Sequence, residues 1–459
     1  MAVLYLTAMA LIYISLSGIF PHIIPQILCK TIAQPLYWRL DANSKKKAVI
    51  NMDNARLKKY AELLVRSGGN VQKGQVVVIG CSVDDAYFGR LVQECAYDAG
   101  ASEVVMDWGD EASARAKFLR ADDGIFDDFP QWKVDWYKHY DDKGAVYLRV
   151  SSTDPDYLAG VDPNRLRRFS KASGIATKAH SAIMMSNTNR WSVCAIPSPA
   201  WAKKVFPNVS EEEAMEKLWA AILKGARADG DNPQTDWEKH KDNFTDRVEY
   251  LNKMNFDSLR ITTGLGTDIT LGLVKNHVWV GGGDTGKDGV PFFPNLPTEE
   301  IFTMPDRTRA NGRVVASMPL SRMGNLIEGF EMTFKDGLVD SFKAEKNEQA
   351  LADMLGMDEG AKRLGEVALV TNSSPIGQMG VLFYNTLFDE NASAHLALGK
   401  AYPNNMKGGD DMTTEKLVEA GGNDSLIHVD FMFGTADMKV IGIGADGTET
   451  VFFDNGEFI

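Results

Sequence analysis

The spacing of apolar positions from Met52 to about residue 150 predicts helices and strands in alternation. Apolar residues at helical spacing are followed by a continuous β-branched run and then by a second helical pattern. The predicted elements are helices over 57–65 and 88–99 and strands over 76–79, 104–106 and 145–150. Strands that are apolar throughout and joined by helices are typical of a parallel sheet covered on both faces, so we expect a wound α/β domain.

The turn after the first predicted strand bears on nucleotide binding. The segment Gly80-Cys81-Ser82-Val83-Asp84 contains neither the GxGxxG pattern nor the lysine of a phosphate-binding loop. A wound α/β fold does not imply a nucleotide by itself, and we therefore do not expect one here.

Two longer helices are predicted next. The stretch over 210–228 opens with Ser210, a good N-cap, and has acidic residues in its first turn and basic residues near its end. Trp237, Phe244 and Leu251 then recur on one side of a second helix that reaches Met254. Both apolar stripes are interpreted as core.

The pattern changes near residue 255, where strand-like segments begin to dominate. Asp336-Gly337 and Asp446-Gly447 indicate hairpin turns, and two helices are expected, over 348–355 and 391–400. The predicted strands are 259–262, 267–273, 277–280, 328–334, 338–344, 426–433 and 440–444. The predicted fold class is therefore α/β, with an N-terminal wound α/β domain over 52–255 followed by a strand-rich α+β domain over 256–459.

Composition and charge exclude several classes of protein. The chain has 459 residues, of which 44% are hydrophobic and 24% charged, which argues against a disordered chain. The 49 basic and 62 acidic residues give a net charge of −13, which would repel phosphates, so no nucleic acid partner is expected. The four cysteines have no CxxC spacing and fit a reducing compartment. Any metal site must then use His, Asp and Glu.

Residues 1–51 form a leader of different composition. Residues 2–29 carry no formal charge, and Lys30, Arg39 and the Lys45-Lys46-Lys47 run follow. One interpretation is upstream translation of a gene that starts at Met52, and the other is a membrane anchor over residues 2–20. In both, the rest of the chain is expected to be cytoplasmic, because the basic residues follow the apolar stretch. A membrane partner is expected only if the anchor is real.

His428 and Asp430 are the first candidate metal ligands. They stand two residues apart in Leu426-Ile427-His428-Val429-Asp430-Phe431, and residues i and i+2 of a strand project to the same face. An imidazole and a carboxylate side by side can bind a divalent ion. The alternative is a strand with one polar face, on which His-x-Asp arises by chance.

Three further residues are candidates because of their surroundings. Glu366 lies within the buried-strand pattern Leu364 to Leu369, where a carboxylate is costly unless it is paired or binds a cation. His395 lies in a small, apolar stretch predicted as helix, and its alternative is a hydrogen-bonded core histidine. Glu300 ends Pro297-Thr298-Glu299-Glu300, a stretch that reads as a loop.

From Met52 onward, and most densely from residue 247, the chain resembles the aminopeptidase T family of cytosolic metallo-aminopeptidases, which includes aminopeptidase S and aminopeptidase II. The matching stretches are Thr263-Gly264-Leu265-Gly266-Thr267-Asp268, PNLPTEEIFTMPD, GFEMTFKDG, RLGEVALV, LFYNTLFDENASAHLALGKAY, and NDSLIHVDFMFG followed by ADM. Residues 1–51 have no counterpart in the family pattern. The resemblance implies that residues 256–459 are a metal-binding catalytic domain. It also implies these metal ligands: Glu300, Glu366, His395, His428 and Asp430.

The implied reaction is hydrolysis of the N-terminal peptide bond. Two divalent ions about 3.5–4 Å apart can lower the pKa of a bridging water and polarise the carbonyl. Either Glu366 or Asp430 would bridge the ions. Tyr402, a further active-site residue by resemblance, would donate its phenolic proton to the oxyanion, or else would be a structural metal ligand or a packing aromatic. The free α-amine of the substrate would bind one ion or the spare carboxylate Glu299.

Three functions are compatible with these residues. The first is a metal-dependent aminopeptidase acting on peptides with a free N-terminus; the second is a two-metal amidase or deacylase acting on a non-peptide substrate; the third is a non-catalytic binding module. The ligand types suit zinc, cobalt and manganese alike. The resemblance implies two ions, zinc or cobalt, with manganese or magnesium as alternatives, and a homodimer.

Overall fold

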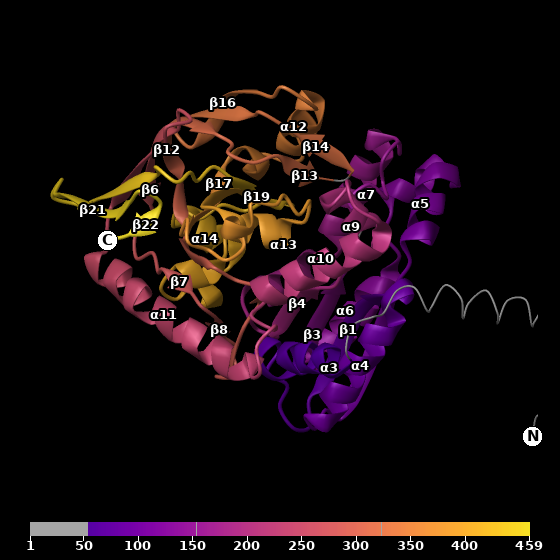
Figure 1. Cartoon of the computed structure of the whole chain (residues 1–459). Helices are drawn as coiled ribbons and strands as arrows, with labels where there is room; N and C mark the ends of the chain where they lie inside the picture. Colours follow the sequence, from indigo (N-terminus) through magenta and orange to yellow (C-terminus); the bar gives the residue numbers. More distant parts are fainter. Residues whose placement is uncertain (1–53, 153, 323) are drawn as a thin grey trace, which may run out of the picture. The chain divides into compact units, whose positions relative to one another are not determined.

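The computed structural model describes residues 54–152, 154–322 and 324–459, and the residues from 54 onward form one compact unit. The leader over 1–51, with its two interpretations, lies outside the described residues. Within the described ranges, no helix is both long and apolar enough to cross a bilayer. Helices and strands alternate over the first half and strands dominate the second (Figure 1), which confirms the predicted α/β class.

The first sheet has five strands in the order β10-β4-β3-β1-β2. All of its strand pairs are parallel, as apolar strands joined by helices predict. The strands are β1 (Val76–Ser82), β2 (Glu103–Gly109), β3 (Val146–Ser151), β4 (Trp191–Ala195) and β10 (Asn295–Leu296). Sequence analysis missed β4 and β10, which are short. Because β10 comes from the second half of the chain, the sheet joins the two halves.

One face of this sheet is closed and the other is partly open. On the closed face, α4 (Ala86–Asp98) packs so tightly that a Cβ on Gly89 would lie 3.0 Å from Cys81 Sγ. Along β3, Leu148 is buried on the closed face, whereas Arg149 on the other face is exposed. The expectation of a sheet covered on both faces is therefore wrong for β3, because the helices on the second side cover only part of it.

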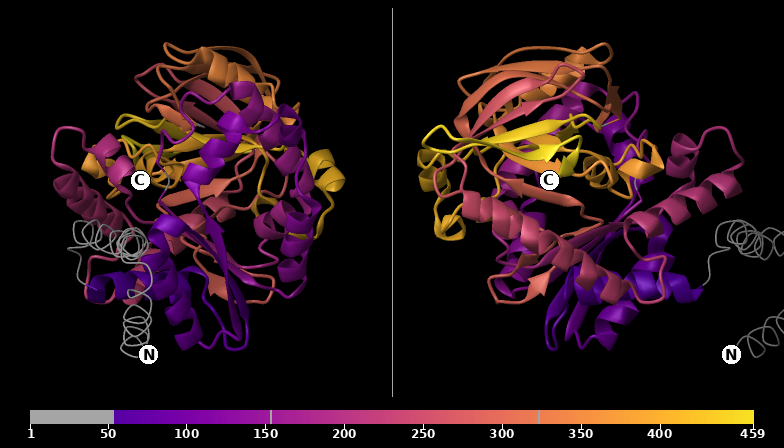
Figure 2. Two further views of the ribbon diagram at one scale, coloured as in Figure 1. Left: turned by 90° about the vertical axis from the view of Figure 1, so that its right-hand side faces the viewer. Right: turned by 60° about the vertical axis from the view of Figure 1, so that its left-hand side comes forward.

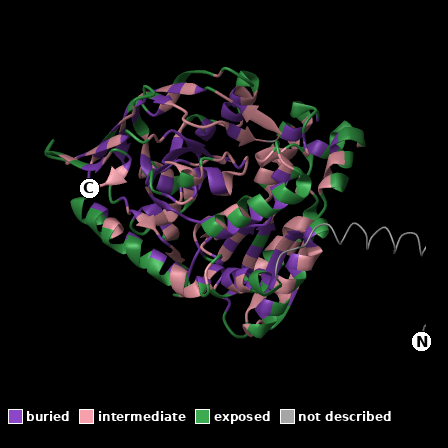
Figure 3. Ribbon diagram, viewed as in Figure 1, coloured by how far each residue is buried: buried purple, intermediate pink, exposed green. Residues whose placement is uncertain are grey.

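Nine helices occur in the described part of the chain up to residue 254. Ser210 caps α10 as predicted, since its hydroxyl accepts a hydrogen bond of 3.2 Å from the Glu213 amide. The helix α11 runs along the edge of the molecule in Figure 1, and Figure 3 shows its outer side exposed. The helices are α3 (Asn54–Leu63), α4 (Ala86–Asp98), α5 (Glu111–Arg120), α6 (Gln131–Asp142), α7 (Pro163–Ala176), α8 (Lys178–Met185), α9 (Pro199–Val205), α10 (Glu211–Gly225) and α11 (Pro233–Met254).

The second half of the chain contains an eight-stranded antiparallel sheet in the order β16-β15-β12-β6-β5-β20-β21-β22. Both predicted Asp-Gly hairpins are confirmed: Asp336 and Gly337 join β15 to β16, and Asp446 and Gly447 join β20 to β21. Figure 2 shows these strands, pink to yellow, above the indigo strands of the parallel sheet. The strands are β5 (Ser258–Thr262), β6 (Asp268–Leu273), β12 (Pro305–Val315), β15 (Glu331–Lys335), β16 (Leu338–Lys343), β20 (Lys439–Ile443), β21 (Glu449–Asp454) and β22 (Glu457–Phe458).

A five-stranded antiparallel sheet, in the order β19-β18-β17-β11-β7, lies at the centre of this half. Its strands are β7 (Val280–Gly281), β11 (Glu300–Thr303), β17 (Leu364–Val370), β18 (His395–Gly399) and β19 (His428–Met432). The helix predicted over 391–400 is wrong. The run Leu396-Ala397-Leu398 is buried on both faces between β17 and β19, and such strands lack the alternation that distinguishes them from helices.

The remaining elements are short. They are β8 (Asp284–Thr285), β9 (Pro291–Phe292), β13 (Leu320–Arg322), β14 (Asn325–Ile327), α12 (Glu348–Leu355), α13 (Thr386–Asp389) and α14 (Thr414–Glu419). After α11 the strands pair antiparallel, except β10, which joins the parallel sheet. The domain boundary near residue 255 stays a prediction.

Candidate metal centre

The five predicted metal ligands lie on four neighbouring strands of the central sheet. Glu300 begins β11, Glu366 is on β17, His395 begins β18, and β19 carries His428 and Asp430. Glu300 therefore belongs to a strand, and the loop expected there is wrong for this residue. Residues far apart in sequence meet here because antiparallel pairing places these strands side by side.

The strand register directs all five side chains to one face. Glu366 is opposite Ala397, which is opposite Asp430, and directly paired residues project to the same side of a sheet. The small side chain of Ala397 leaves room between the two carboxylates. On the other face, Val429 and Phe431 belong to the hydrophobic core, as the alternation around His428 predicts.

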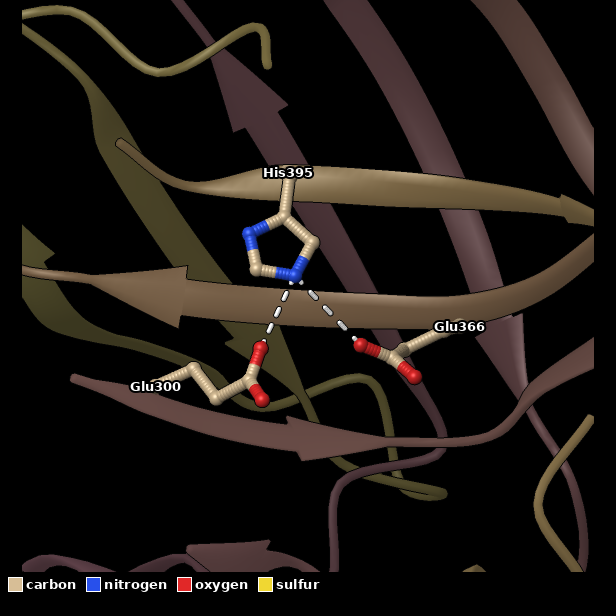
Figure 4. A group of neighbouring side chains, drawn as sticks. All are labelled: Glu300, Glu366 and His395. Atoms are coloured by element: carbon tan, nitrogen blue, oxygen red, sulfur yellow. Dashed lines mark ion pairs between the residues drawn. The ribbon is translucent and has the colours of Figure 1, made fainter. Parts of the chain in front are cut away.

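The first group of potential ligands consists of Glu300, Glu366 and His395 (Figure 4). The Nε2 atom of His395 lies 2.9 Å from Glu300 Oε2 and 3.5 Å from Glu366 Oε1. All three residues are buried. One ligand atom from each lies within 4.8 Å of the others, which is close enough to hold one ion.

The second group shares Glu366 with the first and adds His428 and Asp430. The Nε2 atom of His428 lies 3.6 Å from Glu366 Oε2 and 3.3 Å from Asp430 Oδ1. The two oxygens of Glu366 thus face different histidines. This arrangement distinguishes Glu366 from Asp430, which belongs to one group only.

Backbone carbonyls orient both imidazoles. His395 Nδ1 donates a hydrogen bond of 3.2 Å to the Ser393 carbonyl, and His428 Nδ1 donates one of 2.6 Å to the Lys400 carbonyl. A carbonyl oxygen only accepts, so in each ring Nδ1 carries the proton. Both Nε2 atoms are left facing the carboxylates, the arrangement that metal-binding histidines commonly have.

The hydrogen bonding of Asp430 shows whether these residues are suited to hold a metal ion. Its Oδ1 atom is buried and accepts no hydrogen bond from the described residues, because the 3.3 Å contact with His428 is not aligned as one. A buried carboxylate oxygen without a donor is costly. Two imidazole nitrogens and three carboxylates with such an oxygen are a donor set that divalent metals accept, so the fit is good.

Without an ion, protons compensate the clustered charge. Burial opposes protonation of His428, but Asp430 and Glu366 outweigh it and raise the pKa of the imidazole to about 9. Burial raises the pKa of the Glu366 carboxyl to about 7. Burial lowers the pKa of His395, but hydrogen bonds to Glu300 and Glu366 and the charges of Glu300 and Asp430 outweigh it and raise the pKa well above its usual range. The site therefore favours positive charge, supplied by protons or by metal ions.

Tyr402 lies beside the second group of ligands. Its ring meets that of His428 edge to face, with 4.9 Å between ring centroids, and it lines the same pocket. Burial raises the pKa of the Tyr402 hydroxyl well above its usual range, and the charges of Glu366 and Asp430 raise it further. The hydroxyl therefore keeps its proton at neutral pH and can act as a hydrogen-bond donor.

Glu390 is a fourth pocket carboxylate that sequence analysis missed. It is 8% exposed and lines the pocket together with Glu300, Glu366 and Asp430. Its only hydrogen bond among the described residues is a long one of 3.5 Å from Asn391 Nδ2. Burial and the neighbouring charges of Asp430 and Glu300 raise its pKa well above the usual range. It stands between Asp389 and Asn391, so no local pattern of apolar residues distinguishes it.

Glu299 does not lie where the sequence analysis expected. Its carboxylate forms an ion pair with Arg227 and does not line the pocket, although both chain neighbours, Thr298 and Glu300, do. Adjacent residues of an extended segment project to opposite sides, which explains the difference. This geometry argues against contact between Glu299 and the substrate amine.

The pocket over the metal ligands has a volume of about 80 Å³, and its wall includes Trp191, Asn187 and Asp284. Asp284 accepts a hydrogen bond from Asn187 and one of 2.7 Å from Asn404 Nδ2. Burial raises the pKa of the Asp284 carboxyl to about 6. Within the described residues it forms no ion pair. The pocket therefore carries two carboxylates, Glu390 and Asp284, that belong to neither ligand group.

Comparison with known proteins gives the family. The model of the thermophilic metalloprotease family M29 matches residues 53–458. Aminopeptidase AmpS of Bacillus subtilis is 43% identical over 403 residues, covering 88% of this chain and 98% of its own. Aminopeptidase 2 of Geobacillus stearothermophilus is 42% identical over 409 residues, covering 89% and 99%.

A solved structure agrees with these matches. Wild-type AmpT from Thermus thermophilus superimposes with a TM-score of 0.81 at 40% identity, covering 88% of this chain and 99% of that chain. Fold and sequence thus agree over nearly all of the described residues. The chain belongs to the thermophilic metalloprotease family M29, which confirms the predicted metal-dependent aminopeptidase.

Proposed function

We propose that the chain hydrolyses the N-terminal peptide bond of peptides with two divalent ions held by the two ligand groups, and that Glu366 bridges them. The observation that carries this proposal is the position of Glu366, whose two oxygens face His395 and His428 separately. Glu300 and His395 would complete one site, and His428 and Asp430 the other. Zinc or cobalt are proposed, with manganese or magnesium as alternatives.

When bound, the two metal ions would supply Lewis acidity, which activates a water and polarises the scissile carbonyl. Glu390 is proposed to accept the proton of the attacking water on a carboxylate oxygen and to donate it to the leaving amine. This role is supported by its place in the pocket without any strong hydrogen bond of its own. A raised pKa suits a carboxyl group that must both accept and donate a proton near neutral pH.

Tyr402 is proposed to stabilise the oxyanion that forms as water attacks the carbonyl. Its hydroxyl remains protonated and lines the pocket next to His428. A hydrogen bond from a positioned donor of this kind is stronger in the transition state than in the ground state, because the substrate's carbonyl oxygen gains negative charge there.

Asp284 is proposed in place of Glu299 as the acidic partner of the substrate's free α-ammonium group. It lines the metal pocket and has no cationic partner among the described residues, whereas Glu299 is paired with Arg227. An α-ammonium at Asp284 would limit cleavage to the first peptide bond, since an internal residue has no such charge.

The experiment that tests this function compares two substrates before and after metal removal. Leucine p-nitroanilide should be cleaved, the activity should be lost on chelation, and one of zinc, cobalt, manganese or magnesium should restore it. N-acetyl-leucine p-nitroanilide, which lacks the free amine, should not be cleaved. Equal cleavage of both would favour the amidase or deacylase, and cleavage of neither by the metal-loaded protein would favour the binding module. Neither alternative is supported by the family or the relatives.

A homodimer in the cytoplasm is also proposed, on the basis of the family resemblance. Three cysteines in the described part of the chain, Cys81, Cys95 and Cys194, are free and buried, which suits a reducing compartment. Light scattering of the purified protein would test the dimer.

A further inference from the structure

The open face of the parallel sheet forms a second cavity next to the metal pocket. This cavity has a volume of about 190 Å³. Side chains of β3 and β4 form its floor, and α6 and α8 contribute Trp136 and His180 to its walls. The alternating burial of β3 and β4 comes from this cavity, since their other face packs against the helical turn at 64–68 and the glycine that follows it.

Trp191 connects the two cavities. It is the first residue of β4 and lines both the metal pocket and the sheet cavity. Its indole Nε1 donates a hydrogen bond of 3.0 Å to the Met184 carbonyl, which holds the ring in place. Trp191 is therefore a wall shared by the two cavities, and a peptide whose N-terminal residue lies at the candidate metal ligands would pass this side chain to reach the sheet cavity.

Arg149 is the cation of this second cavity. It is exposed, lines the cavity, and forms no hydrogen bond or ion pair among the described residues. Asp107, which also lines this cavity, is paired with Lys133 at 2.6 Å, and Arg149 lines a neighbouring cavity together with Asp110 and Glu111. Among the described residues Arg149 thus has no ion-pair partner, in a protein of net charge −13. A carboxylate is the group that such a guanidinium binds best, because both its oxygens can be engaged.

The strand register gives the backbone separation between Trp191, in the wall of the metal pocket, and Arg149. Trp191 pairs with Tyr147, and Arg149 lies two residues further along β3. With about 4.8 Å between strands and about 3.3 Å per residue, the Cα atoms of Trp191 and Arg149 are about 8 Å apart. Two or three residues of extended peptide, at about 3.4 Å each, cover that distance.

We infer that the sheet cavity binds the part of the peptide that follows the scissile bond, and that Arg149 binds its C-terminal carboxylate. The substrate class is then short peptides with both termini free, held by a carboxylate of the metal pocket at one end and by Arg149 at the other. This inference rests on the proposed aminopeptidase function and adds to it a preference for peptide length and for a free C-terminus.

The test compares free acids with C-terminal amides. Leucine followed by one to four glycines, in both forms, is assayed with the metal-loaded wild type and with Arg149→Met, and leucine p-nitroanilide serves as a substrate without a carboxylate. The matched control is Arg90→Met, which removes an exposed arginine from α4 on the closed side of the sheet. We expect the wild type and Arg90→Met to prefer one short acid over its amide by at least about tenfold in kcat/KM.

In Arg149→Met this ratio should fall to near one, through a higher KM for the acids, while cleavage of leucine p-nitroanilide is unchanged. An acid-to-amide ratio that is the same in wild type and Arg149→Met, or near one in the wild type at every length, overturns the inference and leaves the aminopeptidase intact. Failure of the wild type to cleave leucine p-nitroanilide overturns the proposed function, and the inference with it.

Discussion

Glu366 and His428 lie on strands that do not pair with each other, yet Glu366 Oε2 is 3.6 Å from His428 Nε2. The strand between them, β18, places Ala397 in the row that joins Glu366 to Asp430. A long carboxylate side chain therefore reaches over a small residue to the far strand. This relationship makes Glu366 common to both ligand groups.

A shared ligand predicts a distinct pattern of metal loss. Glu366→Gln should lose both ions and lower kcat/KM by at least about 100-fold, whereas Glu300→Gln and Asp430→Asn should each lose one ion. Mass spectrometry of metals in the purified variants checks this, with Glu216→Gln, an exposed carboxylate of α10, as the control. Equal metal loss in all three ligand variants would show that Glu366 is not the bridge.

Tyr402→Phe distinguishes a role as oxyanion donor from a role as metal ligand. Loss of an oxyanion donor should lower kcat by about 10²–10³-fold with little change in KM, and both ions should stay bound. Steady-state kinetics together with metal content checks this. A fall in metal content would instead identify Tyr402 as a metal ligand.

Glu390→Gln tests the proposed proton carrier. The amide keeps the shape of the side chain but cannot accept a proton, so kcat should fall by about 10²–10⁴-fold while metal content is unchanged. The matched variant is Glu299→Gln, which removes the neighbouring ion pair with Arg227 and should leave kcat close to that of the wild type. If both variants keep full activity, Glu390 is not the group that carries the proton from the attacking water to the leaving amine.

Metal binding should release protons. In the metal-free centre the pKa of His428 is raised to about 9 by Asp430 and Glu366 against the effect of burial, and burial raises the pKa of Glu366 to about 7. Because ions bind the deprotonated groups, affinity should rise with pH up to about 9 and weaken as pH falls below about 7. Calorimetry of zinc binding in buffers of different ionisation enthalpy measures the protons released, and a heat independent of the buffer would contradict the prediction.

Gly399→Ala should disturb the metal centre from a distance. Gly399 has a φ of +105° and pairs with His428, and an added Cβ would collide with the Ile427 carbonyl. We expect a loss of about 2–4 kcal/mol in stability and weaker metal binding. Thermal unfolding of the variant measures the first, with Gly124→Ala, which has open space around it, as the control.

The metal centre was predictable where local pattern and chemistry agree. His428 and Asp430 share a face because of strand alternation, and Glu366 is conspicuous as a charge in a buried strand. The hairpins at Asp336 and Asp446 were also predictable, since Asp-Gly fits the required turn.

The errors have a common physical origin. His395 was expected on a helix because Leu396-Ala397-Leu398 is compatible with either structure, and only its two strand neighbours select the extended form. Glu299 and Glu390 were misjudged or missed because their roles depend on which way each side chain faces in the folded chain.

Local sequence was sufficient to specify an α/β chain, several strand faces and the chemical types of the metal ligands, because alternation and the cost of buried charge act over a few residues. Strand pairing and packing decided that Glu366 serves both groups, that Glu390 enters the pocket and that one side of the parallel sheet stays open beside Trp191. These features depend on contacts between segments up to hundreds of residues apart, and no local pattern carries that information.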